Sequence, residues 1–132
     1  MLETFHRFRG EAFGLILEDL ARLPRRTPVV VVGFGLLPHL MEPLLTEPRH
    51  AVWPLPTPEF RQVAFGSRAL PEGTFTRKSD PERADRDIAL RDTMYTRRLH
   101  EETARLRLPA ITVDGTMTEG ELAERVSEVF RL

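Results

Sequence analysis

Four consecutive valines, Val29–Val32, constrain the fold of this chain more than any other feature of its sequence. A β-branched run without polar alternation is typical of a strand that is covered on both faces, as in a parallel sheet. Parallel strands require crossover connections, which are usually helices. The run therefore predicts an α/β fold, a parallel sheet with helices on both faces in three α/β/α layers.

Helical and extended patterns alternate along the rest of the 132 residues. Apolar residues recur at the spacing of one helix face in several segments, and short apolar runs separate them. We expect helices over residues 2–23, 36–45 and 81–107, one that begins at Thr57, and one that begins at Thr118. We expect strands at residues 29–32, 51–55 and 109–113. These elements predict one α/β domain over residues 1–132.

Capping residues support several of these boundaries. Asp80 precedes a proline and an acidic helical turn, and Thr118 with Glu121 has the spacing of a capping box. Pro54 weakens the second expected strand because it cannot donate to a ladder. Residues 66–80 are polar and rich in glycine and proline, so we predict a mobile loop there.

Charge and composition exclude some classes of partner. The formal net charge is −1, which gives no sign of a nucleic-acid or anionic membrane surface. The chain has no cysteine, which excludes disulfides and thiolate metal sites. The N-terminal residues are charged where a signal peptide needs an apolar core, and no apolar run reaches membrane length. We therefore expect a cytoplasmic protein without a membrane or nucleic-acid partner.

The common cofactor and metal motifs are incomplete. Gly33 and Gly35 begin a dinucleotide fingerprint, but Pro38 occupies the position of its third glycine. No G-x-x-x-x-G-K-S/T segment occurs, so the chain has no Walker A loop of its own. No two of the four histidines have metal-ligand spacing, so we predict no metal site. The acidic residues at 80–92 alternate with arginines, which favours ion pairs along a solvated helix.

Three segments together resemble a known family: PVVVVGFGLLPHLMEPLL, PTPEF, and ALRDTMYTRRLHEETARLRLPAITVDGT. In this order they are similar to the part of P-loop kinases of the nucleoside monophosphate kinase type that follows the P-loop. The resemblance covers most of the chain. It implies a P-loop kinase-like parallel sheet, incomplete here, and a nucleoside triphosphate, ATP, bound with magnesium.

The resemblance also implies where a ligand binds. In this family, arginines of a lid clamp phosphates, since a planar guanidinium matches phosphate oxygens. The lid-like segment here is about 66–92, and its candidate phosphate-binding residues are Arg77, Arg83, Arg86 and Arg91. Arg83 and Arg91 are favoured because they lie about two helical turns apart. The loop Asp114-Gly115-Thr116 corresponds to the family's base-binding loop.

Both sites have a plainer interpretation that stays open. The arginines could pair with Asp80, Asp87 and Asp92, and the loop could be an ordinary turn before a helix cap. Two departures from the family bear on activity: the Walker A segment is absent, and Val32 stands where relatives carry a glutamate. Both remove groups that phosphoryl transfer needs, so we expect this chain alone to be inactive as a kinase.

The missing segment has a structural consequence. In the family, the P-loop strand lies between the strands that match 29–32 and 51–55. Without it, we expect a gap or a bare strand edge, and hence self-association or a partner chain. Three functions remain open: a phosphotransferase whose P-loop lies outside this sequence, a non-catalytic protein that binds a phosphorylated ligand, and an oligomeric α/β protein with no small-molecule ligand.

Overall fold

The computed structural model describes residues 10, 13–24, 26, 28–33, 35–67 and 80–132. Its helices are α1 (Phe13–Ala21), α2 (Pro38–Met41), α3 (Pro58–Ser67), α4 (Pro81–Leu106) and α5 (Glu119–Phe130). Two short 3-10 turns cover Glu42–Leu44 and Pro48–His50, and the strands are β1 (Trp53–Pro56) and β2 (Ala110–Val113). The described part of the chain is thus mixed helix and strand, as the sequence predicts.

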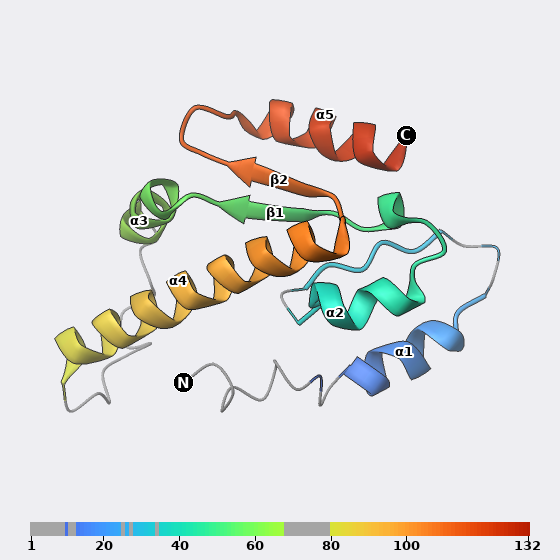
Figure 1. Cartoon of the computed structure of the whole chain (residues 1–132), viewed down its shortest axis with the longest axis horizontal. Coiled ribbons are helices and arrows are strands. Elements are labelled where there is room, and N and C mark those ends of the chain that lie inside the picture. The colour runs from blue at the N-terminus through green and yellow to red at the C-terminus, as the bar shows by residue number, and fades with distance from the viewer. Residues whose placement is uncertain (1–9, 11–12, 25, 27, 34, 68–79) are drawn as a thin grey trace.

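A small parallel sheet organises these elements. β1 pairs with β2 in the register Trp53 to Ala110 through Pro56 to Val113. The chain passes through α3 and α4 between the two strands, so the predicted parallel pairing with a helical crossover is confirmed. In Figure 1 the strands lie between α5 on one side and α4 and α2 on the other. With two strands in the described residues, the sheet is too small to test the full three-layer kinase fold.

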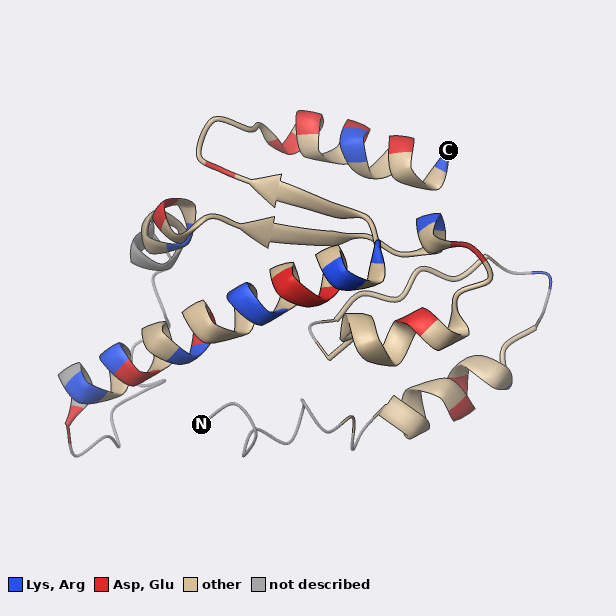
Figure 2. Ribbon diagram, in the orientation of Figure 1, with Lys and Arg blue, Asp and Glu red and all other residues tan. Residues whose placement is uncertain are grey.

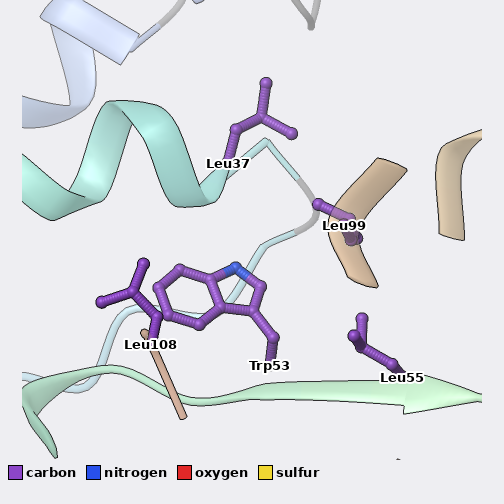
Figure 3. Close-up of a cluster of buried hydrophobic side chains, with 5 residues drawn as sticks. All are labelled: Leu37, Trp53, Leu55, Leu99 and Leu108. Carbon is purple, nitrogen blue, oxygen red and sulfur yellow. The ribbon is translucent and has the colours of Figure 1, made fainter. Parts of the chain in front are cut away.

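The hydrophobic core lies between β1, α4 and the start of α2. Trp53 and Leu55 are separated by two positions on β1, so both side chains point to the same face of the sheet. They pack there with Leu37, Leu99 and Leu108 (Figure 3). The indole Nε1 of Trp53 donates to the carbonyl oxygen of Leu36 at 2.9 Å, so the one polar atom of this side chain is paired.

The helix ends follow the capping residues in the sequence. Asp80 is the N-cap of α4, and its carboxylate accepts from the backbone N–H of Arg83 at 3.0 Å. Thr57 Oγ1 accepts from the backbone N–H of Phe60 at 3.2 Å at the start of α3. Thr118 and Glu121 form the predicted capping box of α5, with the Glu121 carboxylate accepting from the Thr118 N–H at 2.7 Å. All three predicted helix starts are confirmed.

The Thr118→Ala variant is expected to lower the free energy of unfolding by about 1 kcal/mol, since it removes the acceptor for the backbone N–H of Glu121. Urea unfolding followed by circular dichroism measures the loss. Thr93→Ala is the matched control, because its hydroxyl donates to the Ala89 carbonyl within α4 and caps no helix end. An equal loss in both variants would contradict the role of the capping box.

The prediction of a buried strand at Val29–Val32 is wrong. These residues form no strand, and all four valines are exposed, Val30 at 85% and Val32 at 90%. Even the free edge of the described sheet would support such a strand poorly. Pro54 and Pro56 in β1 have no N–H to donate, so a strand along the outer edge of β1 would lose part of its ladder. The valine run is therefore exposed and does not belong to the described sheet.

Three other boundaries differ from the prediction. The helix predicted over 2–23 does not run through Gly10, whose φ of +68° is left-handed; residues 1–9, 11 and 12 lie outside the described ranges. The helix predicted over 36–45 is α2 followed by a 3-10 turn, because Pro43 has no N–H for an α-helical bond. Gly66 and Ser67 belong to α3 rather than to a loop, and residues 68–79 are not described.

Candidate functional site

The carboxyl ends of the two strands meet at one edge of the sheet, where open parallel sheets usually bind ligands. β1 leads through Thr57 into α3, and β2 leads into the turn that begins at Asp114. The backbone N–H of Thr57 donates to the carbonyl oxygen of Val113 at 2.9 Å, which holds these two segments together. Any group one helical turn into α3 therefore lies near this end of the sheet.

Arg61 occupies that position and is partly buried against α4. Its Nη2 donates to Thr96 Oγ1, whereas its buried Nη1 finds no hydrogen-bond partner among the described residues. Burial lowers the pKa of Arg61, and the nearby Asp92 carboxylate opposes this effect. A guanidinium stays charged in proteins, so the unpaired Nη1 is a cationic donor that lacks an acceptor. An anion beside it would supply that acceptor.

The predicted arginines of α4 lie along the same helix, beginning at its N-terminus. Arg83 is exposed and lies 3.9 Å from the Asp87 carboxylate, whereas Arg91 is half-buried and its Nη2 lies 3.3 Å from Asp92 Oδ1. Arg86 is exposed, and Arg77 lies outside the described residues. The ion-pair interpretation thus has support at Asp87 and Asp92. Figure 2 shows acidic and basic residues alternating along α4.

Among the predicted arginines, Arg91 is linked to Arg61 through the Asp92 carboxylate. Arg91 contacts the Asp92 carboxylate directly, and the same carboxylate raises the pKa of Arg61 by charge attraction. Arg83 and Arg86 lie one to two helical turns nearer the N-terminus of α4.

The predicted base-binding loop is a tight turn. Asp114 Oδ1 accepts from the backbone N–H of Thr116 at 2.9 Å and from its hydroxyl at 2.7 Å. These hydrogen bonds lower the pKa of the Asp114 carboxyl. A Cβ on Gly115 would meet no atom within 4 Å, so packing does not require glycine there. The local bonds agree with the plainer interpretation, a turn before the α5 cap.

The described residues contain no cluster of metal ligands, whereas Arg61 has a cationic donor without a partner among them. No group of three or more His, Asp or Glu side chains within them could hold a metal. Two of the histidines already have partners: His39 Nδ1 lies 2.8 Å from Glu102 Oε2, and His50 Nδ1 lies 3.0 Å from Thr46 Oγ1. The unpaired nitrogen of Arg61 instead matches an oxyanion.

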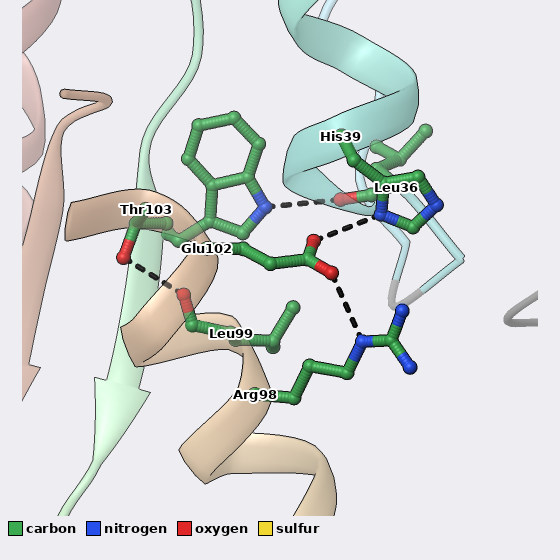
Figure 4. Close-up of polar contacts among 7 residues, drawn as sticks. Leu36, His39, Arg98, Leu99, Glu102 and Thr103 are labelled. Carbon is green, nitrogen blue, oxygen red and sulfur yellow. Dashed lines mark hydrogen bonds and ion pairs between the residues drawn. The ribbon is translucent and has the colours of Figure 1, made fainter. Parts of the chain in front are cut away.

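A second polar cluster joins α2 to α4 outside the predicted site. The Glu102 carboxylate accepts from Arg98 Nε at 2.9 Å and lies 2.8 Å from His39 Nδ1 (Figure 4). Thr103, also buried, donates to the Leu99 carbonyl oxygen within α4 at 2.8 Å. Glu102 is nearly buried and fully paired, so this cluster stabilises the packing of α2 on α4.

Sequence analysis missed Arg61 and its partner Thr96. The available signal was position: Arg61 follows the helix start at Thr57 by four residues, directly after a strand that ends in a parallel sheet. The neighbouring α4 residue could not be inferred, because Thr96 is 35 positions away in the sequence. This pair could therefore be recognised only from the packing of α3 against α4.

Comparison with known protein families, with curated proteins and with solved structures finds no match for the chain. None of the helices in the described ranges combines the length and apolar character that a membrane span requires.

Proposed function

We propose that this chain is a P-loop kinase-like protein that binds a nucleotide or another phosphorylated ligand through arginines of α3 and α4. The observation that carries the proposal is the buried Nη1 of Arg61, which lacks a partner in the described part of the chain. It lies one turn into α3, near the carboxyl end of β1, where parallel sheets usually present their ligands. Arg83, Arg86 and Arg91 of α4, with Arg77, are the proposed lid residues.

The chemistry of such a site is binding and charge neutralisation. Guanidinium groups donate to phosphate oxygens in charge-assisted hydrogen bonds, which are about twice as strong as neutral ones. ATP and magnesium are the ligands that the family resemblance implies. The described residues offer no cluster of metal ligands, so in this proposal the magnesium would be held by the phosphates of the nucleotide.

Catalysis by this chain alone is not part of the proposal. Phosphoryl transfer in P-loop enzymes depends on the backbone N–H groups and lysine of the Walker A loop. This sequence contains no such loop, and Val32 cannot accept a proton or orient a metal-bound water. Reading the DNA upstream of Met1 for an in-frame G-x-x-x-x-G-K-S/T segment tests whether a longer protein supplies these groups.

Calorimetric titration with ATP tests the binding, with and without magnesium, and with inorganic phosphate as a second probe. Arg61→Met is expected to weaken ATP binding by about tenfold to a hundredfold, since one charge-assisted hydrogen bond contributes about 1.5–3 kcal/mol. Arg97→Met is the matched control because this arginine is exposed and already pairs with Glu101 one turn further along α4. Circular dichroism shows whether each variant keeps its helices.

The outcome separates three cases. No heat with millimolar ATP in the wild-type protein would end the proposal. Equal weakening by Arg61→Met and Arg97→Met would mean that binding depends on overall charge and not on this site. Weakening by Arg83→Ala and Arg91→Ala but not by Arg61→Met would place the ligand at the lid alone.

The second candidate is a non-catalytic oligomeric α/β protein with no small-molecule ligand. The ion pairs of Arg83 and Arg91 and the closed turn at Asp114 favour it, because each already satisfies the groups that a ligand would use. It predicts that no nucleotide shifts the melting temperature, whereas a ligand that binds the native state must raise it.

A further inference from the structure

The two outer edges of the sheet differ in their backbone chemistry. The N–H of Trp53 donates to the Pro109 carbonyl, and the N–H of Thr57 donates to the Val113 carbonyl, so odd-numbered residues of β1 face β2. Backbone groups alternate between the edges of a strand, so the even-numbered residues of both strands face outward. Pro54 and Pro56 therefore lie along the outer edge of β1, and Ala110 and Thr112 along that of β2.

The outer edge of β1 cannot pair fully with another strand. Both of its outward-facing residues are prolines, which leave two carbonyl acceptors and no N–H donor. Proline on an edge strand, with its nitrogen turned away from the sheet, is a common protection against strand addition. The sheet is therefore closed to growth on this side.

Within the described residues, the outer edge of β2 has no proline and no paired strand, and α5 runs along this side of β2 (Figure 1). The N–H and C=O groups of Ala110 and Thr112 have no partner among the described residues, and both residues are exposed. β2 carries no proline and no charged residue, and both strands lack charge in Figure 2. Natural sheets often protect such an edge with charge or proline, so an edge that has neither indicates a pairing surface.

We propose that the outer edge of β2 is a self-association surface that pairs with the same edge of a second copy of this chain. In an antiparallel pair about a twofold axis at Ile111, Ala110 faces the partner's Thr112 and Thr112 faces the partner's Ala110. Each facing pair exchanges two backbone hydrogen bonds. The dimer contains one continuous four-stranded sheet in the order β1, β2, β2, β1.

A second copy fits this edge for two reasons. The residues whose backbone groups face this edge, Ala110 and Thr112, have small, uncharged side chains on one face of the sheet, so two copies meet without charge repulsion or bulk. The dimer is also closed, because each end of the four-stranded sheet is then the proline edge of β1. An isologous contact that ends in protected edges gives a finite dimer rather than a fibre. This inference is independent of the proposed ligand.

Sedimentation of the full chain over about a hundredfold range of protein concentration tests the proposal. The wild-type protein is expected to shift from monomer to dimer as concentration rises. Thr112→Pro is expected to raise the dimer dissociation constant by at least about tenfold, because it removes two of the intermolecular donors and adds a ring to the edge. Thr112→Val keeps the N–H and the β-branched shape and is expected to dimerise like the wild type.

The prolines of β1 provide a test from the other edge. The double variant Pro54→Val, Pro56→Val adds two outward N–H groups to β1, so its outer edge can pair with another strand. Species larger than a dimer are therefore expected at concentrations at which the wild type is a dimer. A wild-type monomer throughout, or a Thr112→Pro dimer of wild-type affinity, would overturn the proposal. A Thr112→Pro dimer of wild-type affinity would mean that the copies associate through another surface, such as the exposed Val29–Val32.

Hydrogen exchange gives a readout that does not depend on folding of the proline variant. The amide of Thr112 is expected to exchange rapidly in dilute protein and to be protected in concentrated protein, whereas the Leu55 amide, which faces β2 within one chain, stays protected in both. Equal exchange of the Thr112 amide at both concentrations would contradict pairing at this edge.

Discussion

Leu55→Ala is expected to lower the free energy of unfolding by about 2–5 kcal/mol, the range for large-to-small changes at well-packed core positions. Leu55 is 2% exposed and lies on β1 against α4, between the sheet and the helix that covers it. Its truncation removes apolar burial and leaves a cavity that Trp53 and Leu99 can fill only in part. For a single small domain, this is a large share of the total stability.

Urea unfolding followed by tryptophan fluorescence measures the effect, because Trp53 is the only tryptophan of the sequence and packs in the same cluster. Leu15→Ala is the matched control, since Leu15 is 64% exposed on α1 and is expected to change stability by less than about 0.5 kcal/mol. Similar losses in the two variants would show that the β1–α4 contact is not the main core of the chain.

The helical part of the fold could be predicted because its signals are local. Proline and capping side chains act within one turn, so Asp80, Thr57 and Thr118 identify the starts of α4, α3 and α5 without tertiary information. The strand at 109–113 is likewise bounded by a proline and an Asp-Gly turn. The parallel pairing followed from the alternation of these strands with helices.

The valine run shows the limit of this reasoning. Its composition is that of a buried strand, but a strand exists only where a neighbour accepts and donates backbone hydrogen bonds. Pro54 argues against β1 as a strand in the sequence, yet β1 forms, whereas Val29–Val32 is exposed and joins no strand in the described residues. Whether Pro54 faces β2 or the outer edge depends on the register with β2, which the sequence does not specify.

The candidate site was predicted only in part for a similar reason. Arginines in an acidic helix are visible in the sequence, and the structure pairs Arg83 and Arg91 with the carboxylates beside them. Arg61 was not found, because its burial against Thr96 depends on how α3 packs on α4. A buried unpaired donor is a property of tertiary packing, and no local pattern reports it.

Glu102→Gln is expected to destabilise the protein by about 1–3 kcal/mol at neutral pH, since it removes the charge that joins α2 to α4. The Glu102 side chain is 10% exposed and accepts from Arg98 Nε at 2.9 Å, with His39 Nδ1 at 2.8 Å (Figure 4). The amide keeps the size of the carboxyl group but can no longer balance the Arg98 charge. His39 and Arg98 are more exposed, so water offsets part of the loss.

The effect of Glu102→Gln is expected to depend on pH in a definite direction. Burial raises the pKa of Glu102, but the hydrogen bonds and charges of His39 and Arg98 outweigh it, so the pKa lies below its ordinary value of 4.5. Below that value the unfolded chain binds a proton that the folded chain does not. The stabilisation is therefore fully present above pH 4.5 and is lost as pH falls through the folded-state pKa.

Urea unfolding of the wild type and of Glu102→Gln from about pH 7 to pH 3 measures this difference directly. Exposed carboxylates such as Glu121 titrate alike in both proteins, so their contribution cancels when the two curves are subtracted. The gap between the curves is expected to narrow as pH falls below 4.5. A gap that stays constant down to pH 3 would mean that the loss in Glu102→Gln does not follow the ionisation of the carboxylate, and would contradict a charge-dependent contact between α2 and α4.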